Sequence, residues 1–147
     1  MKIQKIIFPT DFSHASDAAM AFASSLARDT GAKMLIVHVE EPPTAYGGGN
    51  LYYGVPEPER DALMEMLERL KPTTDDVPYE HRLLSGDPAR QVIELAEQEK
   101  AGLIVMGTHG RTGILRLLMG SVAEEIVRRS SCPVVTFKAP EAANESD

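Results

Sequence analysis

The chain has 147 residues, of which 43% are hydrophobic and 25% are charged, so length and composition predict one globular domain rather than a disordered chain. Its 15 Lys and Arg residues stand against 22 Asp and Glu residues, which leaves a net charge of −7. This balance excludes the broad nucleic-acid binding that depends on a dense positive surface, so any phosphate ligand must be held locally.

The single cysteine, Cys132, excludes an intramolecular disulfide and favours a reducing compartment. Only a short apolar run precedes Pro9, which is too little for the core of a signal peptide. No stretch of the sequence approaches the roughly 20 apolar residues of a membrane span. We therefore expect a cytoplasmic protein without a membrane partner.

The apolar pattern of the first half predicts two strands around a helix. KIIFPT, residues 5–10, is rich in β-branched residues and is typical of a buried strand. Residues 17–30 carry a helical stripe of apolar side chains, and Gly31 follows as the glycine that ends the helix. MLIVHV, residues 34–39, is a second buried strand, and a surface loop rich in Pro, Gly and Tyr runs from Glu41 to Pro58.

The second half continues the alternation. Helical spacing returns over residues 59–70, and residues 79–85 form a third strand that is less apolar and therefore nearer a sheet edge. In the turn that follows, Asp87 caps a helix that Pro88 opens. The last elements are that helix, to about residue 100, a strand at 103–106, a helix at about 121–129 and a strand at 133–137.

This order predicts an α/β domain over residues 1–140, built on a parallel, doubly wound sheet with helices on both faces. Residues 141–147 form a solvated tail. In such folds ligands bind beyond the carboxyl ends of the strands. The stretches to follow are therefore residues 9–13, 39–41, 85–87 and 107–112.

The connection GTHGRTGILRLLMGS, residues 107–121, places four glycines between a buried strand and a helix. It matches neither the dinucleotide fingerprint G-x-G-x-x-G nor the P-loop G-x-x-x-x-G-K-[ST]. Gly107 directly follows the strand, where it leaves room for a ligand. Gly110 and Gly113 let the loop turn its N–H groups inward as an anion-binding nest.

At the end of this connection, Gly120 lets a phosphate reach the start of the next helix, where Ser121 caps the helix and offers its hydroxyl. Arg111 can add positive charge, and His109 can bond to a phosphate or a ribose hydroxyl. The apolar ILRLLM, residues 114–119, is expected to pack or to form a short helical turn that holds the two ends of the connection apart. The alternative is that the glycines only close turns and Ser121 is an ordinary N-cap.

Two further residues are candidates at the same edge. Asp11 follows the first strand, where its carboxylate can bind ribose hydroxyls or a Mg²⁺ on the phosphates, or simply cap the next helix. His38 lies in a buried strand and is predicted to be a hydrogen-bonded core histidine. With no Ser-His-Asp order, nucleophile elbow or zinc-type cluster in the sequence, we predict no catalytic residue.

The spacing G-x2-G-x9-G-[ST], met by Gly107, Gly110, Gly120 and Ser121, resembles the nucleotide-binding signature of the universal stress protein family, in its ATP-binding branch. PTDFS after the first strand, VHV in the second and CPVVTF at the close extend the resemblance over nearly the whole chain. It implies a five-stranded, Rossmann-like sheet of the adenine nucleotide alpha hydrolase-like type, in the order 3-2-1-4-5. It also implies a homodimer through the last strand, from Pro133 to Lys138.

Carried over position by position, the resemblance implies a site for ATP or another adenine nucleotide, with Mg²⁺ or Mn²⁺. Asp11 would meet the ribose or the metal, with Pro9 and Thr10 shaping the pocket. Val39 would contact adenine through its backbone, and Met106 and Gly107 would line the ribose and adenine side. The phosphates would be surrounded by Gly110, Arg111, Gly120, Ser121 and Val122.

These residues supply donors for phosphates but no base aimed at a γ-phosphate, so we expect tight binding with slow hydrolysis at most. The main expectation is a dimeric ATP-binding protein of the stress response, whose nucleotide state biases its contacts with partners. One alternative is an ATPase or phosphotransferase with its acceptor bound under the loop at 41–58. Another is an interaction module that keeps the fold without a nucleotide.

Overall fold

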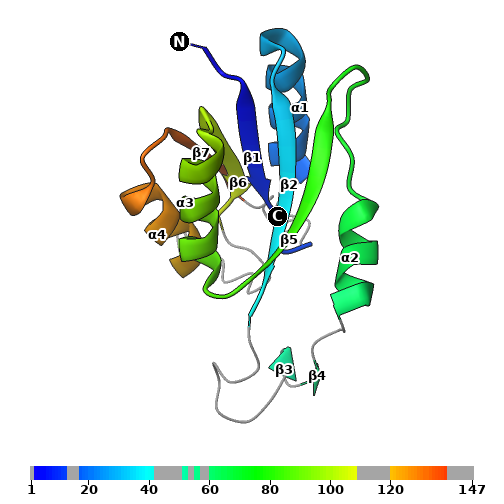
Figure 1. The fold of residues 1–147 in the computed structure, drawn as a ribbon, viewed down its shortest axis with the longest axis vertical. Coiled ribbons are helices and arrows are strands. Elements are labelled where there is room, and N and C mark those ends of the chain that lie inside the picture. Colours follow the sequence, from blue (N-terminus) through cyan, green and yellow to red (C-terminus); the bar gives the residue numbers. More distant parts are fainter. Residues whose placement is uncertain are drawn as a thin grey trace, which may run out of the picture.

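A computed structural model describes residues 2–12, 17–41, 51–52, 55–56, 60–108 and 120–138 of the chain (Figure 1). Strands and helices alternate along it, as the apolar pattern predicts. The helices are α1 (Asp17–Thr30), α2 (Arg60–Glu68), α3 (Pro88–Glu99) and α4 (Ser121–Arg129). The strands are β1 (Lys5–Pro9), β2 (Lys33–Glu40), β3 (Leu51–Tyr52), β4 (Val55–Pro56), β5 (Tyr79–Ser85), β6 (Leu103–Gly107) and β7 (Val134–Phe137).

Five of these strands form one parallel sheet in the order β5-β2-β1-β6-β7. Numbered among themselves, they follow the order 3-2-1-4-5, so the predicted doubly wound fold is confirmed. The prediction that residues 79–85 lie near an edge is also confirmed, because β5 is one of the two edge strands. β7 is the other.

The central strands are apolar on both faces because helices cover both faces. Ile6 and Phe8 of β1 pack in a cluster with α1 and α2. Ile7, between them, points to the opposite face and packs with α3 and α4. All three side chains are at most 1% exposed. This two-sided burial explains why β1 has a continuous apolar run instead of alternating polar and apolar residues.

Two boundaries differ from the sequence prediction. The predicted loop at 41–58 contains a small antiparallel hairpin, β3 with β4. Strands of two residues are too short to produce a periodicity that the sequence could reveal. Helix α2 ends at Glu68 rather than at residue 70, because the N–H groups of residues 69 and 70 bond to carbonyls three residues back.

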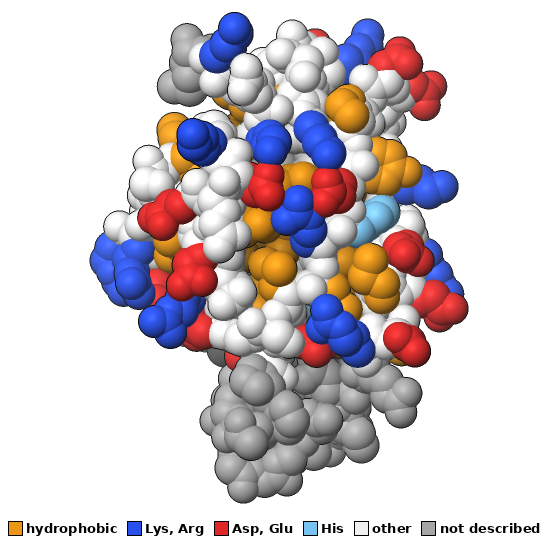
Figure 2. Space-filling view, in the orientation of Figure 1, with side chains coloured by type: hydrophobic (Ala, Val, Ile, Leu, Met, Phe, Trp, Pro, Cys, Tyr) orange, Lys and Arg blue, Asp and Glu red, His pale blue; other side chains and the backbone are white. Residues whose placement is uncertain are grey.

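A chain of alternating charges crosses the α3 face of the sheet, where Figure 2 shows acidic and basic side chains gathered side by side. Lys33 Nζ lies 2.7 Å from Glu80 Oε1, and the other oxygen of Glu80 contacts Arg82 Nε. Arg82 Nη2 lies 3.2 Å from Glu99 Oε2, and Lys5 Nζ lies 2.6 Å from Glu99 Oε1. The network links three strands to the C-terminal end of α3.

The network changes the acidity of its members. Hydrogen bonds from Lys33, and next from Arg82, lower the pKa of Glu80 to about 2. Hydrogen bonds from Lys5 and Arg82 likewise lower the pKa of Glu99. The bond to Glu80 in turn raises the pKa of Arg82. Both carboxylates are therefore ionised, and the network is complete, at neutral pH.

We expect acid to weaken the fold through these two carboxylates. The pKa of Glu80 is about 2 in the folded chain against an ordinary 4.5, so its stabilisation is complete above about pH 4.5 and is lost as the pH falls toward 2. The double variant Glu80→Gln/Glu99→Gln should lose about 1 kcal/mol at pH 7 and show a smaller acid-induced fall. Urea unfolding across this pH range measures both effects, and a wild-type acid response in the variant would contradict the assignment.

Candidate functional site

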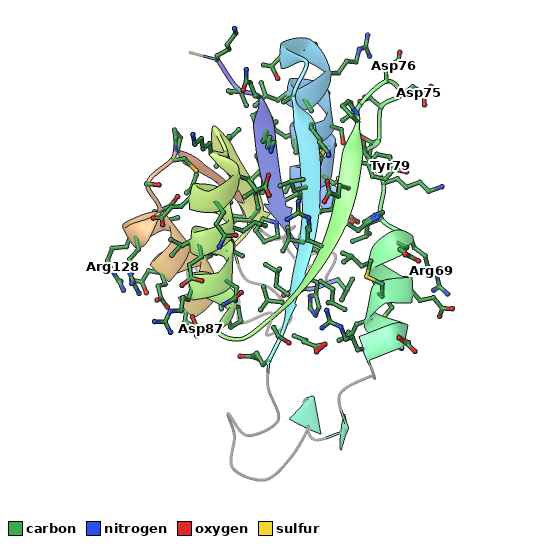
Figure 3. The ribbon with its side chains drawn as sticks, in the orientation of Figure 1. Arg69, Asp75, Asp76, Tyr79, Asp87 and Arg128 are labelled. Atoms are coloured by element: carbon green, nitrogen blue, oxygen red, sulfur yellow. The ribbon has the colours of Figure 1, made fainter. Side chains whose placement is uncertain are left out.

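The carboxyl ends of four neighbouring strands meet at one edge of the sheet, toward which β1, β2 and β5 run downward in Figure 1. Strands β1, β2, β5 and β6 end there, and helices α3 and α4 begin there. This is the edge at which doubly wound folds bind ligands. The acidic pair Asp75 and Asp76 lies at the opposite end, in the turn before β5 (Figure 3), and so plays no part in a site at this edge.

At the end of β1, a buried histidine holds the backbone in place. Thr10 is only 8% exposed; its N–H donates to the Val37 carbonyl at 2.8 Å, and its own carbonyl accepts from Nδ1 of His38 at 2.8 Å. The N–H of Phe12 donates to Thr10 Oγ1, and the Phe12 ring lies 4.4 Å from the His38 ring. The prediction of a hydrogen-bonded core histidine is therefore confirmed.

Asp11 lies between these two anchored residues, at the ligand edge. The described part of α1 begins at Asp17, so the alternative that Asp11 caps this helix stays a prediction. Among the described residues, no group of three or more His, Cys, Asp or Glu side chains could hold a metal ion. A metal at Asp11 would therefore need phosphate oxygens or water as its other ligands, which is how Mg²⁺ is commonly held in proteins.

At the end of β2, the backbone of Val39 extends beyond β1. The Val37 carbonyl bonds toward β1 and the Glu40 carbonyl bonds toward β5, where it accepts from the N–H of Gly86 at 2.9 Å. Bonding directions alternate along a strand, so the N–H and C=O of Val39 face the β1 side. Pro9 pairs with Val37, which leaves Val39 two residues beyond that register. Its peptide groups therefore offer one donor and one acceptor at the sheet edge.

The two ends of the glycine-rich connection meet at Thr108. This residue follows β6 and is 4% exposed. Its N–H donates to the Phe137 carbonyl of β7 at 2.9 Å, and its carbonyl accepts from the N–H of Gly120 at 2.6 Å. The expectation for ILRLLM, residues 114–119, lies outside the described residues and stays a prediction. Gly107 and Gly120 are brought close together, because a direct backbone bond closes the connection.

The N-cap of α4 is Gly120, so the prediction that Ser121 caps this helix is wrong. Ser121 is the first residue inside the helix, and the cap makes no side-chain hydrogen bond. The backbone of Gly120, with φ −72° and ψ 163°, is in a region that any residue can adopt. The backbone conformation therefore does not require a glycine here.

Helix α3 also begins at the carboxyl edge of the sheet, but its first turn has a side-chain cap. Asp87, labelled in Figure 3, is the N-cap of α3. The Asp87 carboxylate accepts from the N–H of Arg90 at 3.0 Å. The predicted cap and the predicted Pro88 at the first helical turn are both confirmed. One helix start at this edge thus carries its own negative charge, while the other, at Gly120, presents backbone N–H groups without a side-chain cap.

The other predicted residues are distributed as follows. Pro9 is half-buried as the last residue of β1, and Met106 is buried in the cluster beneath α3 and α4. Ser121 and Val122 are exposed in the first turn of α4. Three predicted residues lie outside the described part of the chain, and their roles stay predictions: His109, Gly110 and Arg111.

One contact at this edge has no signal in the sequence. Arg60, the first residue of α2, pairs with the Glu40 carboxylate at 3.1 Å and donates to the Leu83 carbonyl at 3.0 Å. These three residues come from separate elements. Neither spacing nor residue type could have paired them before the fold was known.

Comparison with known proteins finds relatives over nearly the whole chain. The model of the universal stress protein family matches residues 2–138. Over 141 residues, the chain is 34% identical to universal stress protein MJ0531 of Methanocaldococcus jannaschii, which covers 93% of this chain and 83% of that protein. In the described part of the chain, no helix is long and apolar enough to cross a membrane.

Solved structures share the fold. The structure of protein MJ0577 of Methanocaldococcus jannaschii matches with a TM-score of 0.77 at 24% identity, covering 97% of this chain and all of that one. A universal stress protein crystallised in complex with cAMP matches with a TM-score of 0.66 at 28% identity, covering 93% of this chain and 98% of that one. The first supports the fold alone, and the second is a relative that holds an adenine nucleotide.

The cap of α3 generates a prediction that is independent of any ligand. Asp87→Ala removes the carboxylate that accepts the Arg90 N–H, so we expect a loss of about 1 kcal/mol in the free energy of unfolding. Urea denaturation measures this loss. Asp87→Asn, which keeps an acceptor at the cap, should stay close to the wild type. Equal losses in the two variants would show that the cap bond is not the cause.

Proposed function

The chain belongs to the universal stress protein family, and from this we propose that it binds an adenine nucleotide at the carboxyl edge of its sheet and acts as a regulatory protein. The observation that carries the proposal is the start of α4, where a glycine N-cap stands beside the end of β6. The relative solved with cAMP supports the ligand class. ATP is the nucleotide that the resemblance implies, because Gly107, Gly110, Gly120 and Ser121 match the signature of the family's ATP-binding branch.

The phosphates would bind at the first turn of α4. The first N–H groups of a helix have no partner within the helix, and the helix dipole makes this end attractive to anions. Gly120 has no side chain that could bond to these N–H groups. Because any residue could adopt its φ, we attribute the glycine to the space that a phosphate needs at this position. In a chain with a net charge of −7, such backbone donors offer a way to hold phosphate without a basic surface.

The base would be recognised by the peptide groups of Val39. Adenine presents a donor, its exocyclic amine, next to a ring nitrogen that accepts. The N–H and C=O of Val39 face the β1 side beyond the paired part of β1, and they offer the complementary pair. Backbone recognition of this kind depends on the position of the strand end and not on the Val39 side chain.

Asp11 would meet the ribose hydroxyls or a Mg²⁺ or Mn²⁺ on the phosphates. Its neighbours Thr10 and Phe12 are fixed by hydrogen bonds, so the carboxylate is carried on an ordered turn. Of the other acids at this edge, Glu40 pairs with Arg60 and Asp87 caps α3. Phosphoryl transfer needs a positioned nucleophile as well as charge stabilisation, so the role that we propose is binding with slow hydrolysis at most.

We further propose that two copies pair through β7. In this strand, residues 133 and 137 bond to β6, so Val134 and Thr136 point their backbone groups outward from the sheet. Phe22 of α1 is 39% exposed, and its ring lies 5.4 Å from that of Phe137, which adds apolar surface beside the edge. An uncharged edge strand of this kind invites pairing with another chain.

The other edge of the sheet is less suited to pairing. β5 carries Glu80 and Arg82 within the charge network, and Arg60 bonds to the Leu83 carbonyl. Charged side chains on an edge strand oppose the addition of another strand. Cys132 makes no disulfide within the chain, which supports a reducing, cytoplasmic setting for the dimer.

The phosphate site can be tested by giving α4 a cap of its own. Gly120→Asp should stabilise the fold by roughly 0.3 kcal/mol, because aspartate is a better N-cap than glycine. It should weaken ATP binding by at least roughly tenfold, because the carboxylate would occupy and repel the phosphate. Urea unfolding and titration calorimetry with Mg-ATP measure the two effects, which have opposite signs.

Two controls sharpen this experiment. Gly120→Ser supplies a neutral cap and should lose less affinity than Gly120→Asp, while Asp87→Ala changes only the neighbouring helix and should keep the affinity of the wild type. Wild-type affinity for ATP in Gly120→Asp would place the phosphates elsewhere. A wild-type protein that binds no adenine nucleotide would refute the proposed function.

The dimer can be tested at a position whose N–H faces outward. Thr136→Pro removes this donor without breaking a bond between β6 and β7, so it should raise the dimer dissociation constant by at least roughly tenfold. Thr136→Val keeps the donor and should remain dimeric. Sedimentation equilibrium at micromolar concentration distinguishes the two variants, and a monomeric wild type would contradict the proposal.

A further inference from the structure

Arg60 joins three elements at the carboxyl edge of the sheet. It is the first residue of α2, and its Nη1 lies 3.1 Å from Oε1 of Glu40, the last residue of β2. Its Nη2 donates to the Leu83 carbonyl of β5 at 3.0 Å. One planar guanidinium therefore holds a carboxylate and a carbonyl on two neighbouring strands at the same time, which a lysine could not do with the same geometry.

The Leu83 carbonyl lies on the outer side of the sheet. Before β5, the Pro78 carbonyl accepts from the N–H of Met34 in β2, and after β5 the N–H of Gly86 donates to the Glu40 carbonyl of β2. Bonding directions alternate along a strand, so even-numbered residues of β5 face β2, and Leu83 faces outward. Arg60 therefore reaches around the edge of the sheet and ties its outer side to the end of β2.

The end of β2 is thus held from two sides. The Glu40 carbonyl accepts from Gly86 at 2.9 Å, and the Glu40 carboxylate pairs with Arg60. The Glu40 side chain is 21% exposed and the Arg60 side chain 55% exposed, so this pair is only partly shielded from solvent. The peptide plane between Val39 and Glu40 contains the Val39 carbonyl and the N and Cα atoms of Glu40, so contacts that restrain Glu40 also limit how far that carbonyl can turn.

We propose that Arg60 is a positioning residue for recognition of the base: by holding Glu40 and Leu83, it fixes the Val39 carbonyl toward the exocyclic amine of adenine. This inference rests on the proposed function. Guanine carries an oxygen where adenine carries that amine, so a rigidly placed carbonyl accepts from adenine and repels guanine. A carbonyl that can turn away discriminates less between the two bases.

The test compares Arg60→Met with Arg69→Met. Arg69 follows the other end of the same helix and points away from the sheet (Figure 3), so its loss removes a similar side chain without touching the strands. Titration calorimetry with ATP, GTP and inorganic triphosphate is run on each full-length protein. We expect Arg60→Met to lose about tenfold in ATP affinity, equivalent to about 1.4 kcal/mol, with a similar fall in the preference for ATP over GTP. Triphosphate binding should not change, and Arg69→Met should behave as the wild type.

Each outcome decides the question. An unchanged preference for ATP over GTP in Arg60→Met, with normal binding by the wild type, overturns this inference and leaves the proposed function in place. Equal losses for ATP and triphosphate also overturn it, because they indicate general loosening of the site. A wild type that binds none of the three ligands overturns both proposals. Should Arg60→Met fold poorly, Glu40→Gln removes the charge of the same pair and is judged by the same ATP-to-GTP preference.

Discussion

The hydrogen bonds of the Thr108 peptide groups are the contacts on which the carboxyl edge of the sheet depends. The N–H bonds to β7 and the carbonyl bonds to Gly120, so one residue connects the end of β6, an edge strand and the start of α4. Ala123 and Ile126 then bury the helix against the sheet. Together these contacts hold the first turn of α4 at the carboxyl ends of the strands, where its N–H groups can meet an anion.

The distribution of charge explains why such a backbone site suits this protein. Lys5, Lys33 and Arg82 are all bound to carboxylates in the network that crosses the α3 face of the sheet, and Arg60 is held by Glu40. These cations stabilise the fold and are not available as a basic surface. At the carboxyl edge of the sheet, the first N–H groups of α4 offer a phosphate local donors in place of these cations.

The sequence predicted the helices well where capping or helix-ending residues coincide with apolar periodicity. Helix α3 was placed by Asp87 and Pro88, and the end of α1 by Gly31, whose φ of +76° favours glycine. In both cases neighbours in the chain determine the structure. The strand order 3-2-1-4-5 could not be predicted from such local signals, and the resemblance to a family supplied it.

The features that the sequence did not predict depend on contacts between segments that are distant along the chain. The pattern Gly120-Ser121 contains a good capping residue, yet Gly120 is the N-cap, and its N–H bonds to the Thr108 carbonyl across the connection. The pairing of Arg60 with Glu40 and Leu83 depends on how α2 lies against β2 and β5. Neither outcome follows from propensity or spacing within one segment.

The unequal edges of the sheet also limit how far an assembly of this chain can grow. A domain with two open edges could add copies at both and extend into a fibril. Here β5 carries charged side chains and the Arg60 contact, while β7 points Val134 and Thr136 outward. Pairing through one edge alone uses the same surface on both copies, which closes the assembly by two-fold symmetry. Growth would then stop at two chains, and the sheet of the dimer would have a charged strand at each end.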